Sequence, residues 1–121
     1  MTKTYLVALN DGVKFKTTNL DLKSIKSDLE SRATHAVKMN RKGVKKNLVI
    51  HVADENTKNP TDKNLIVTVA DEVFYLKVDD IDKAIDSVIN DVNTKPWVEI
   101  GGELLFEKNA FRYVEEYIKP E

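Results

Sequence analysis

The fold is decided by the stretch Asn64–Asn90, which reads NLIVTVADEVFYLKVDDIDKAIDSVIN. Apolar, β-branched and aromatic residues dominate positions 65–70 and again 73–78, a pattern typical of two strands. The polar pair Asp71-Glu72 between them predicts a tight turn. This stretch therefore begins with a β-hairpin.

An amphipathic helix is predicted immediately after this hairpin. Asp79 and Asp80 carry carboxylates that can accept hydrogen bonds from the free amides of a first helical turn. Apolar residues then recur at helical spacing and form one stripe, at Ile81, Ala84, Ile85, Val88, Ile89 and Val92. Because such a stripe must be buried, we expect the helix to pack on the preceding hairpin.

The remaining chain predicts more strands and a second helix. Six further strands are expected, over residues 5–9, 13–16, 35–39, 48–53, 97–100 and 104–106. A helix is expected near residues 22–29, a turn at 40–43 and an exposed loop at 54–64. The tail from Phe111 fits either a helix, after a helical turn near Asn109, or a strand, and no internal repeat is visible.

These elements predict an α+β fold, a mainly antiparallel sheet built from hairpins with two or three helices packed on it. A length of 121 residues suits one domain covering residues 1–121, with a small C-terminal subdomain from about residue 95 as an alternative. The absence of cysteine excludes disulfides, thiolate metal sites and cysteine nucleophiles. No apolar run is long enough for a signal peptide or a membrane span, so a cytoplasmic protein is expected.

Charge is distributed unevenly along the chain, although the net charge is −1. Residues 1–53 hold eleven Lys/Arg and four Asp/Glu, whereas residues 71–121 hold six Lys/Arg and thirteen Asp/Glu. A basic front half and an acidic back half are compatible with a polar partner surface, head-to-tail association or internal pairing.

The basic residues concentrate in an acid-free run, residues 31–53. Its candidate nucleic-acid-binding residues, expected near the tip of a hairpin around Gly43, are Lys38, Arg41, Lys42, Lys45 and Lys46. No aromatic residue is interleaved with them to stack on bases, so a solvated turn is the alternative.

Aromatic residues concentrate in the last 25 positions. Candidate protein-interface residues there are Trp97, Phe106, Phe111, Tyr113 and Tyr117. Glutamates surround them in the sequence, an arrangement that suits an aromatic contact patch with an acidic rim. The alternative is that these aromatics anchor the core.

No catalytic motif is visible in the sequence. His35 and His51 are the only histidines, no serine lies in a glycine-flanked elbow, and no glycine-rich phosphate loop exists. We therefore expect no catalytic residues, no metal site and no cofactor. A small hydrolase is a further alternative, and it requires a concave site where two or more of Asp79, Asp82 and Glu103 meet.

The segment from Trp97-Val98-Glu99-Ile100-Gly101-Gly102 to Phe111 resembles the endings of small uncharacterised proteins from phages, prophages and plasmids of Gram-positive bacteria. The resemblance covers about 20 residues and implies an accessory or host-interaction role, without site residues. The sequence thus predicts a non-enzymatic interaction or accessory module that contacts another protein or a second copy of itself. A nucleic-acid-binding accessory protein is the alternative.

Overall fold

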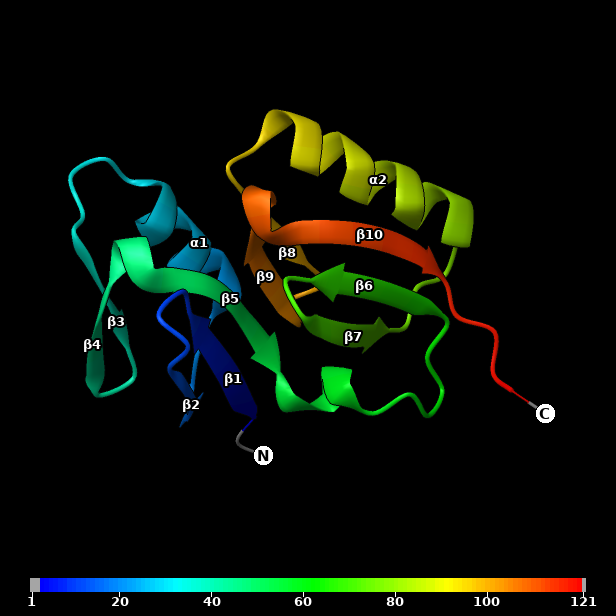
Figure 1. Ribbon diagram of the computed structural model, residues 1–121, viewed down its shortest axis with the longest axis horizontal. Coiled ribbons are helices and arrows are strands. Elements are labelled where there is room, and N and C mark those ends of the chain that lie inside the picture. Colours follow the sequence, from blue (N-terminus) through cyan, green and yellow to red (C-terminus); the bar gives the residue numbers. More distant parts are fainter. Residues whose placement is uncertain (1–2, 121) are drawn as a thin grey trace.

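Ten strands and two α-helices make up residues 3–120, which the computed structural model describes (Figure 1). All strand pairs among these residues are antiparallel, which confirms the α+β class. The first half contains β1 (Thr4–Leu9), β2 (Lys14–Thr18), α1 (Leu22–Glu30), β3 (Ala36–Met39), β4 (Lys42–Lys45), the 3-10 helix η1 (Lys46–Leu48) and β5 (Val49–Asp54). After the 3-10 helix η2 (Glu55–Lys58), the second half contains β6 (Leu65–Val69), β7 (Glu72–Leu76), α2 (Ile81–Thr94), β8 (Trp97–Ile100), β9 (Leu104–Glu107), the 3-10 helix η3 (Lys108–Ala110) and β10 (Phe111–Glu116).

The two halves repeat one order of elements: hairpin, helix, hairpin, 3-10 helix, strand. We call residues 4–54 the N-terminal repeat and residues 65–116 the C-terminal repeat. In each repeat the last strand pairs with the first strand, which gives β2-β1-β5 in one and β7-β6-β10 in the other. This repeat is not visible in the amino-acid sequence.

The repeat extends to register and caps. In the N-terminal repeat, β5 has a β-bulge at Ile50, an extra residue opposite the step from Ala8 to Leu9. In the C-terminal repeat, β10 has the corresponding β-bulge at Arg112, opposite the step from Thr68 to Val69. Asp21 caps α1 and Asp80 caps α2, each through a side-chain oxygen that accepts from a first-turn amide at 3.1 Å.

Equivalent backbone bonds also recur between the repeats. The amides of Asn10 and Ala70 donate to the carbonyls of Leu48 and Ala110, each at 2.7 Å. Because the bulges, caps and loop hydrogen bonds all coincide, each position of one repeat has a defined equivalent in the other.

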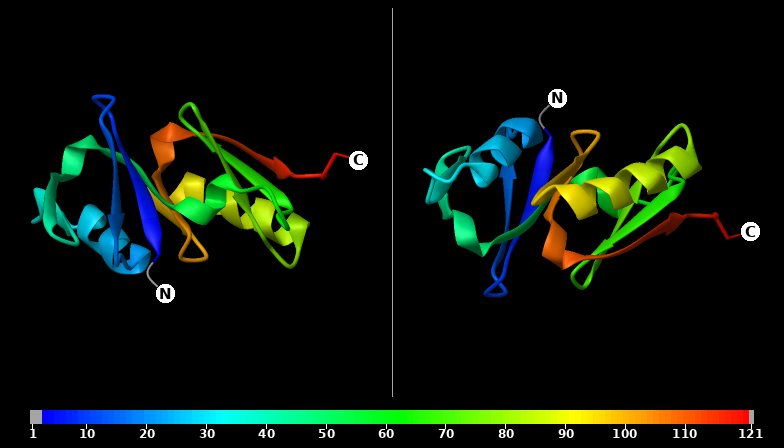
Figure 2. Two further views of the ribbon diagram at one scale, coloured as in Figure 1. Left: turned by 90° about the horizontal axis from the view of Figure 1, so that it is seen from below. Right: turned by 90° about the horizontal axis from the view of Figure 1, so that it is seen from above.

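The repeats differ in where their second hairpins lie. Hairpin β8–β9 adds β9 to the free side of β5 and completes a five-stranded sheet, β2-β1-β5-β9-β8. Hairpin β3–β4 forms a separate two-stranded sheet, and β10 remains an edge strand of the sheet β10-β6-β7. Figures 1 and 2 show hairpin β3–β4 at one end of the long axis and β10 with α2 at the other.

Two clusters of buried side chains form the core. The first lies between α1, hairpin β3–β4 and one face of the five-stranded sheet, and includes Leu22, Val44, Val52 and Trp97. The second lies between the other face of this sheet, α2 and the three-stranded sheet, and includes Phe74 and Phe106 among its members. Residues after Lys95 therefore contribute to both clusters.

Three local expectations require correction. The basic hairpin forms between β3 and β4, so Lys42, Gly43 and Lys45 lie along a strand and not at a tip. The loop expected at 54–64 contains η2, and Thr57 within it is fully buried, bonded to the Asp54 carbonyl at 2.7 Å. The tail is strand β10, because its backbone pairs with β6, and the helical turn near Asn109 is η3.

Candidate functional site

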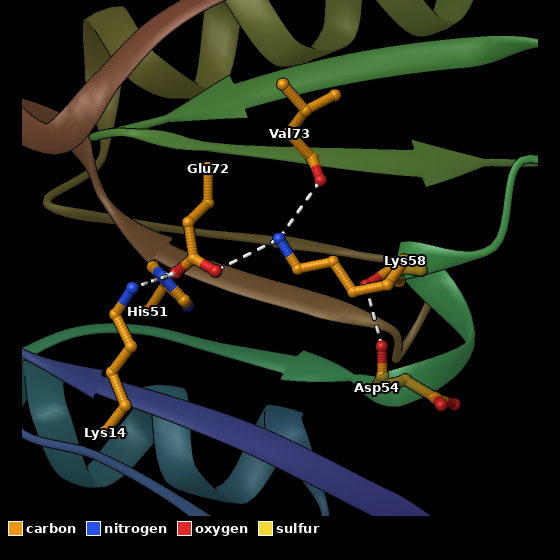
Figure 3. A network of polar contacts seen from close by, with 7 residues as sticks. Lys14, His51, Asp54, Lys58, Glu72 and Val73 are labelled. Carbon is orange, nitrogen blue, oxygen red and sulfur yellow. Dashed lines mark hydrogen bonds and ion pairs between the residues drawn. The ribbon is translucent and has the colours of Figure 1, made fainter.

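A polar network joins the two repeats at His51 and Glu72 (Figure 3). His51 lies on β5 and Glu72 at the start of β7, and the His51 Nε2 to Glu72 Oε2 distance is 2.7 Å. Lys58 of η2 binds Glu72 Oε1 at 3.0 Å, and Lys14 of β2 lies 3.6 Å from Glu72 Oε2. Lys58 also donates to the Val73 carbonyl at 3.2 Å. Each partner of Glu72 comes from a different element.

The imidazole of His51 is almost completely buried, with 2% of its surface exposed. Its ring lies edge-on to Phe74, with 4.9 Å between centroids, and its Nδ1 has no hydrogen-bond partner within residues 3–120. Burial lowers the pKa of His51, and the nearby Glu72 carboxylate only partly offsets this effect. The neutral ring therefore donates from Nε2 to Glu72, because a proton on Nδ1 would be buried without an acceptor.

Glu72 remains ionised. Burial opposes its ionisation, but the hydrogen bond and charge of Lys58, together with His51, outweigh burial and lower the pKa of Glu72. The ammonium of Lys58 also lies 4.2 Å from the centroid of the Phe74 ring. Both carboxylate oxygens are thus occupied by donors from the same chain.

Two shallow cavities, each of about 200 Å³, adjoin this network. Both are lined by Ala8, Lys14, His51 and Glu72, and one also reaches Phe15. A histidine–carboxylate pair serves as a general base when its second ring nitrogen faces a nucleophile. The second nitrogen of His51 is instead buried and unpartnered, so this geometry favours a structural role.

The basic candidates lie on hairpin β3–β4 and η1. Lys38, Arg41, Lys42 and Lys45 are exposed, and within residues 3–120 none of them forms an ion pair. The Lys42 ammonium lies over the Phe15 ring at 4.1 Å. Lys46 is half-buried and donates to the Ser31 carbonyl. Four of the five candidates thus share one exposed hairpin.

The aromatic candidates divide between core and surface. Trp97 and Phe106 are 7% and 0% exposed, so their side chains offer little or no area to a partner. Phe111 stacks on Phe106 at 5.9 Å, and Tyr117 contacts Tyr75 edge-on at 5.1 Å. Tyr113 on β10 is 49% exposed, which makes it the most accessible of the five candidates.

The acidic candidates do not converge. Asp79 and Asp82 are exposed near the start of α2, while Glu103 lies in the turn between β8 and β9. Among residues 3–120, no three His, Asp or Glu side chains come close enough to hold a metal ion. His35 lies just before β3 and is exposed, whereas His51 is buried.

Comparisons with protein-family models, curated proteins and solved structures found no match to this chain. Across the described residues, no helix has both the length and the apolar character needed to cross a membrane.

The pairing of His51 with Glu72 was not predicted from the sequence. The two residues are separated along the chain and meet only when the sheets of the two repeats pack together. The one signal available was a histidine in a strand that is otherwise apolar, at residues 49–53.

Proposed function

We propose that this chain is a non-enzymatic interaction module that acts through an open sheet edge. The observation that carries the proposal is β10, which pairs with β6 on one side and with no strand of residues 3–120 on the other. An exposed edge strand presents unpaired amides and carbonyls to which an extended segment of a partner can add.

The other edge of this sheet is protected. Lys58 and Lys63 donate to the β7 carbonyls of Val73 and Tyr75, each at 3.2 Å. These bonds occupy backbone groups that a partner strand would need. No side chain of residues 3–120 protects the β10 edge in this way, and this edge carries exposed Tyr113, Glu115 and Glu116. The contrast supports β10 as the contact surface.

Capture of partners from a lysate of the source cells tests this proposal. The amide of Tyr117 donates toward β6, to the Asn64 carbonyl at 2.9 Å, so the neighbouring amide of Glu116 faces the open edge. Glu116→Pro therefore removes an outward donor and leaves the β6 ladder intact. Tyr113→Ala removes exposed aromatic surface, and Val13→Ala is its control, because Val13 is 51% exposed in the turn before β2.

We expect folded Glu116→Pro and Tyr113→Ala to lose a partner that wild type and Val13→Ala retain. Retention of every partner by both edge variants would contradict the proposal.

A nucleic-acid-binding role is the second candidate, supported by the four exposed cations of hairpin β3–β4. Fluorescence anisotropy against duplex and single-stranded DNA at increasing salt tests it. Binding that weakens steeply with salt and is lost when Arg41, Lys42, Lys45 and Lys46 become glutamate would favour this role. Absence of binding at low salt would remove it. The resemblance to phage and plasmid proteins stays a prediction.

A further inference from the structure

The contact between β5 and β9 has no counterpart at the end of the C-terminal repeat. Within the chain, β9 covers the free side of β5, with His51, Val52 and Ala53 opposite Phe106, Leu105 and Leu104. When the two repeats are compared, β10 corresponds to β5 and β4 corresponds to β9. In one copy these two strands lie at opposite ends of the long axis (Figures 1 and 2), so they can meet only between copies.

We propose that β4 of one copy docks on β10 of a second copy, head to tail, and repeats between copies the β5–β9 pairing found within each chain. This proposal rests on the proposed function and names a second copy as a partner of the same edge. Such a contact uses different surfaces on the two copies, so it generates chains or rings of copies.

The equivalent register brings compatible residues together. Transferring the β5–β9 pairs to the new contact places Tyr113 opposite Val44, Val114 opposite Gly43, and Glu115 opposite Lys42. The amide of Asp54 extends the internal ladder by donating to the Glu103 carbonyl at 2.7 Å. Its equivalent is the outward amide of Glu116, which would donate to the Arg41 carbonyl.

The charges of the two edges are complementary. The apolar pair of Ala53 and Leu104 is replaced at the new contact by Glu115 and Lys42, and Glu116 follows next to Arg41. Arg112 and Lys45, which carry like charges, lie outside the three-residue ladder. Docking therefore gives the exposed cations of hairpin β3–β4 carboxylate partners that they lack within residues 3–120.

Helix α2 is less covered than α1. Leu22, Ile25 and Leu29 of α1 are 2–4% exposed and share a core cluster with Trp97 and Leu105 of hairpin β8–β9. On α2 only Val88 is buried, whereas Ile89 is 45% exposed. In the proposed contact, hairpin β3–β4 of the second copy takes the place on α2 that hairpin β8–β9 takes on α1.

Charge exchange tests the contact with purified, nuclease-treated protein. Sedimentation velocity over a wide concentration range is expected to show a mass that rises above the monomer. Lys42→Glu alone and Glu115→Lys alone should each weaken association several-fold or more, because like charges then face each other. An equimolar mixture of the two variants should restore it, since each variant complements the other. The double variant should restore it as well.

Cysteine cross-linking tests the register, since the chain has no other cysteine. Residues 42 and 115 are equivalent to residues 104 and 53, which lie opposite each other on β9 and β5. This pair lies between two hydrogen-bonded pairs of the ladder. Side chains at such a position are close enough to form a disulfide. Lys42→Cys with Glu115→Cys should give disulfide-linked dimers and longer species. Lys38→Cys with Glu115→Cys is the control, because Lys38 lies on β3, away from the docking strand.

Each remaining outcome would overturn the proposal. The proposal fails if the protein is monomeric at the highest concentration and both cysteine pairs cross-link equally. It also fails if Lys42→Glu and Glu115→Lys leave the association unchanged. If purified protein is monomeric but capture of another protein still depends on Glu116 and Tyr113, only this inference fails. If that capture also fails, the proposed function fails with it.

Discussion

Acid should destabilise this protein through His51 between pH of about 6.5 and 5. Burial lowers the pKa of the His51 imidazole below its ordinary value of about 6.5, so the unfolded chain binds more protons than the folded protein as the pH falls through this range. One such proton lowers the free energy of unfolding by at most about 1.4 kcal/mol per pH unit. Because the unfolded imidazole is only half protonated at pH 6.5, the loss from His51 between pH 6.5 and 5 stays below about 2 kcal/mol.

The groups that face His51 fix the sign and the range. Lys14 and Lys58 disfavour a second positive charge, while Glu72 favours it without reversing the effect of burial. Glu72 has a lowered pKa, so its own contribution is present above its ordinary pKa of about 4.5 and is lost as pH falls through the folded value. Measurements above pH of about 5 therefore isolate the histidine.

Denaturant unfolding at several pH values, monitored through Trp97 fluorescence, measures this effect. His51→Gln should flatten the dependence of the unfolding free energy on pH, whatever its effect on stability at pH 7. His35→Gln is the control, because His35 is exposed and should leave the slope unchanged. A slope in His51→Gln equal to that of wild type would refute the assignment of the lost stability to this imidazole.

Four further substitutions test local features of the fold by thermal and denaturant unfolding. Glu72→Ala removes the carboxylate that binds His51 and Lys58 and pairs with Lys14, and it should cost about 1–3 kcal/mol. A cost near zero would contradict a stabilising role for this network. Asp80→Ala and Asp21→Ala should each cost about 1 kcal/mol, since each removes a helix cap, and unchanged stability would show that capping is dispensable. Ala70→Gly should stabilise the protein by up to about 1 kcal/mol, because Ala70 has a φ of 54°, and a lower melting temperature would contradict this.

Features set by neighbouring residues could be predicted from the sequence. The start of α2 depends on an aspartate side chain and an amide three residues away, and Asp80, one of the two predicted caps, is found in that role. The hairpin of β6 and β7 likewise follows from strand patterns on either side of a short polar turn. Such signals are contained in a few adjacent positions, so the pattern alone is enough.

Features set by distant pairing could not be predicted. The segment Lys42-Gly43-Val44-Lys45 has little strand character of its own, and it becomes β4 because β3 provides a partner. The His51–Glu72 pair requires two sheets to pack before its members meet. The repeat is hidden for a related reason: equivalent positions such as Ala53 and Glu115 share backbone register but face different surroundings, one covered by β9 and the other exposed.

Under the proposed contact, the same difference explains why β4 and β10 carry opposite charges at positions 42 and 115. A contact made within one chain, such as Ala53 with Leu104, forms as the protein folds and can be apolar. An edge that stays exposed until a second copy arrives needs charge to remain soluble, and lysine or glutamate on an edge strand also discourages indiscriminate pairing. Placing Lys42 on β4 and Glu115 on β10 does this with opposite signs at opposite ends of the molecule. Two like ends then repel, so only the head-to-tail arrangement joins complementary edges.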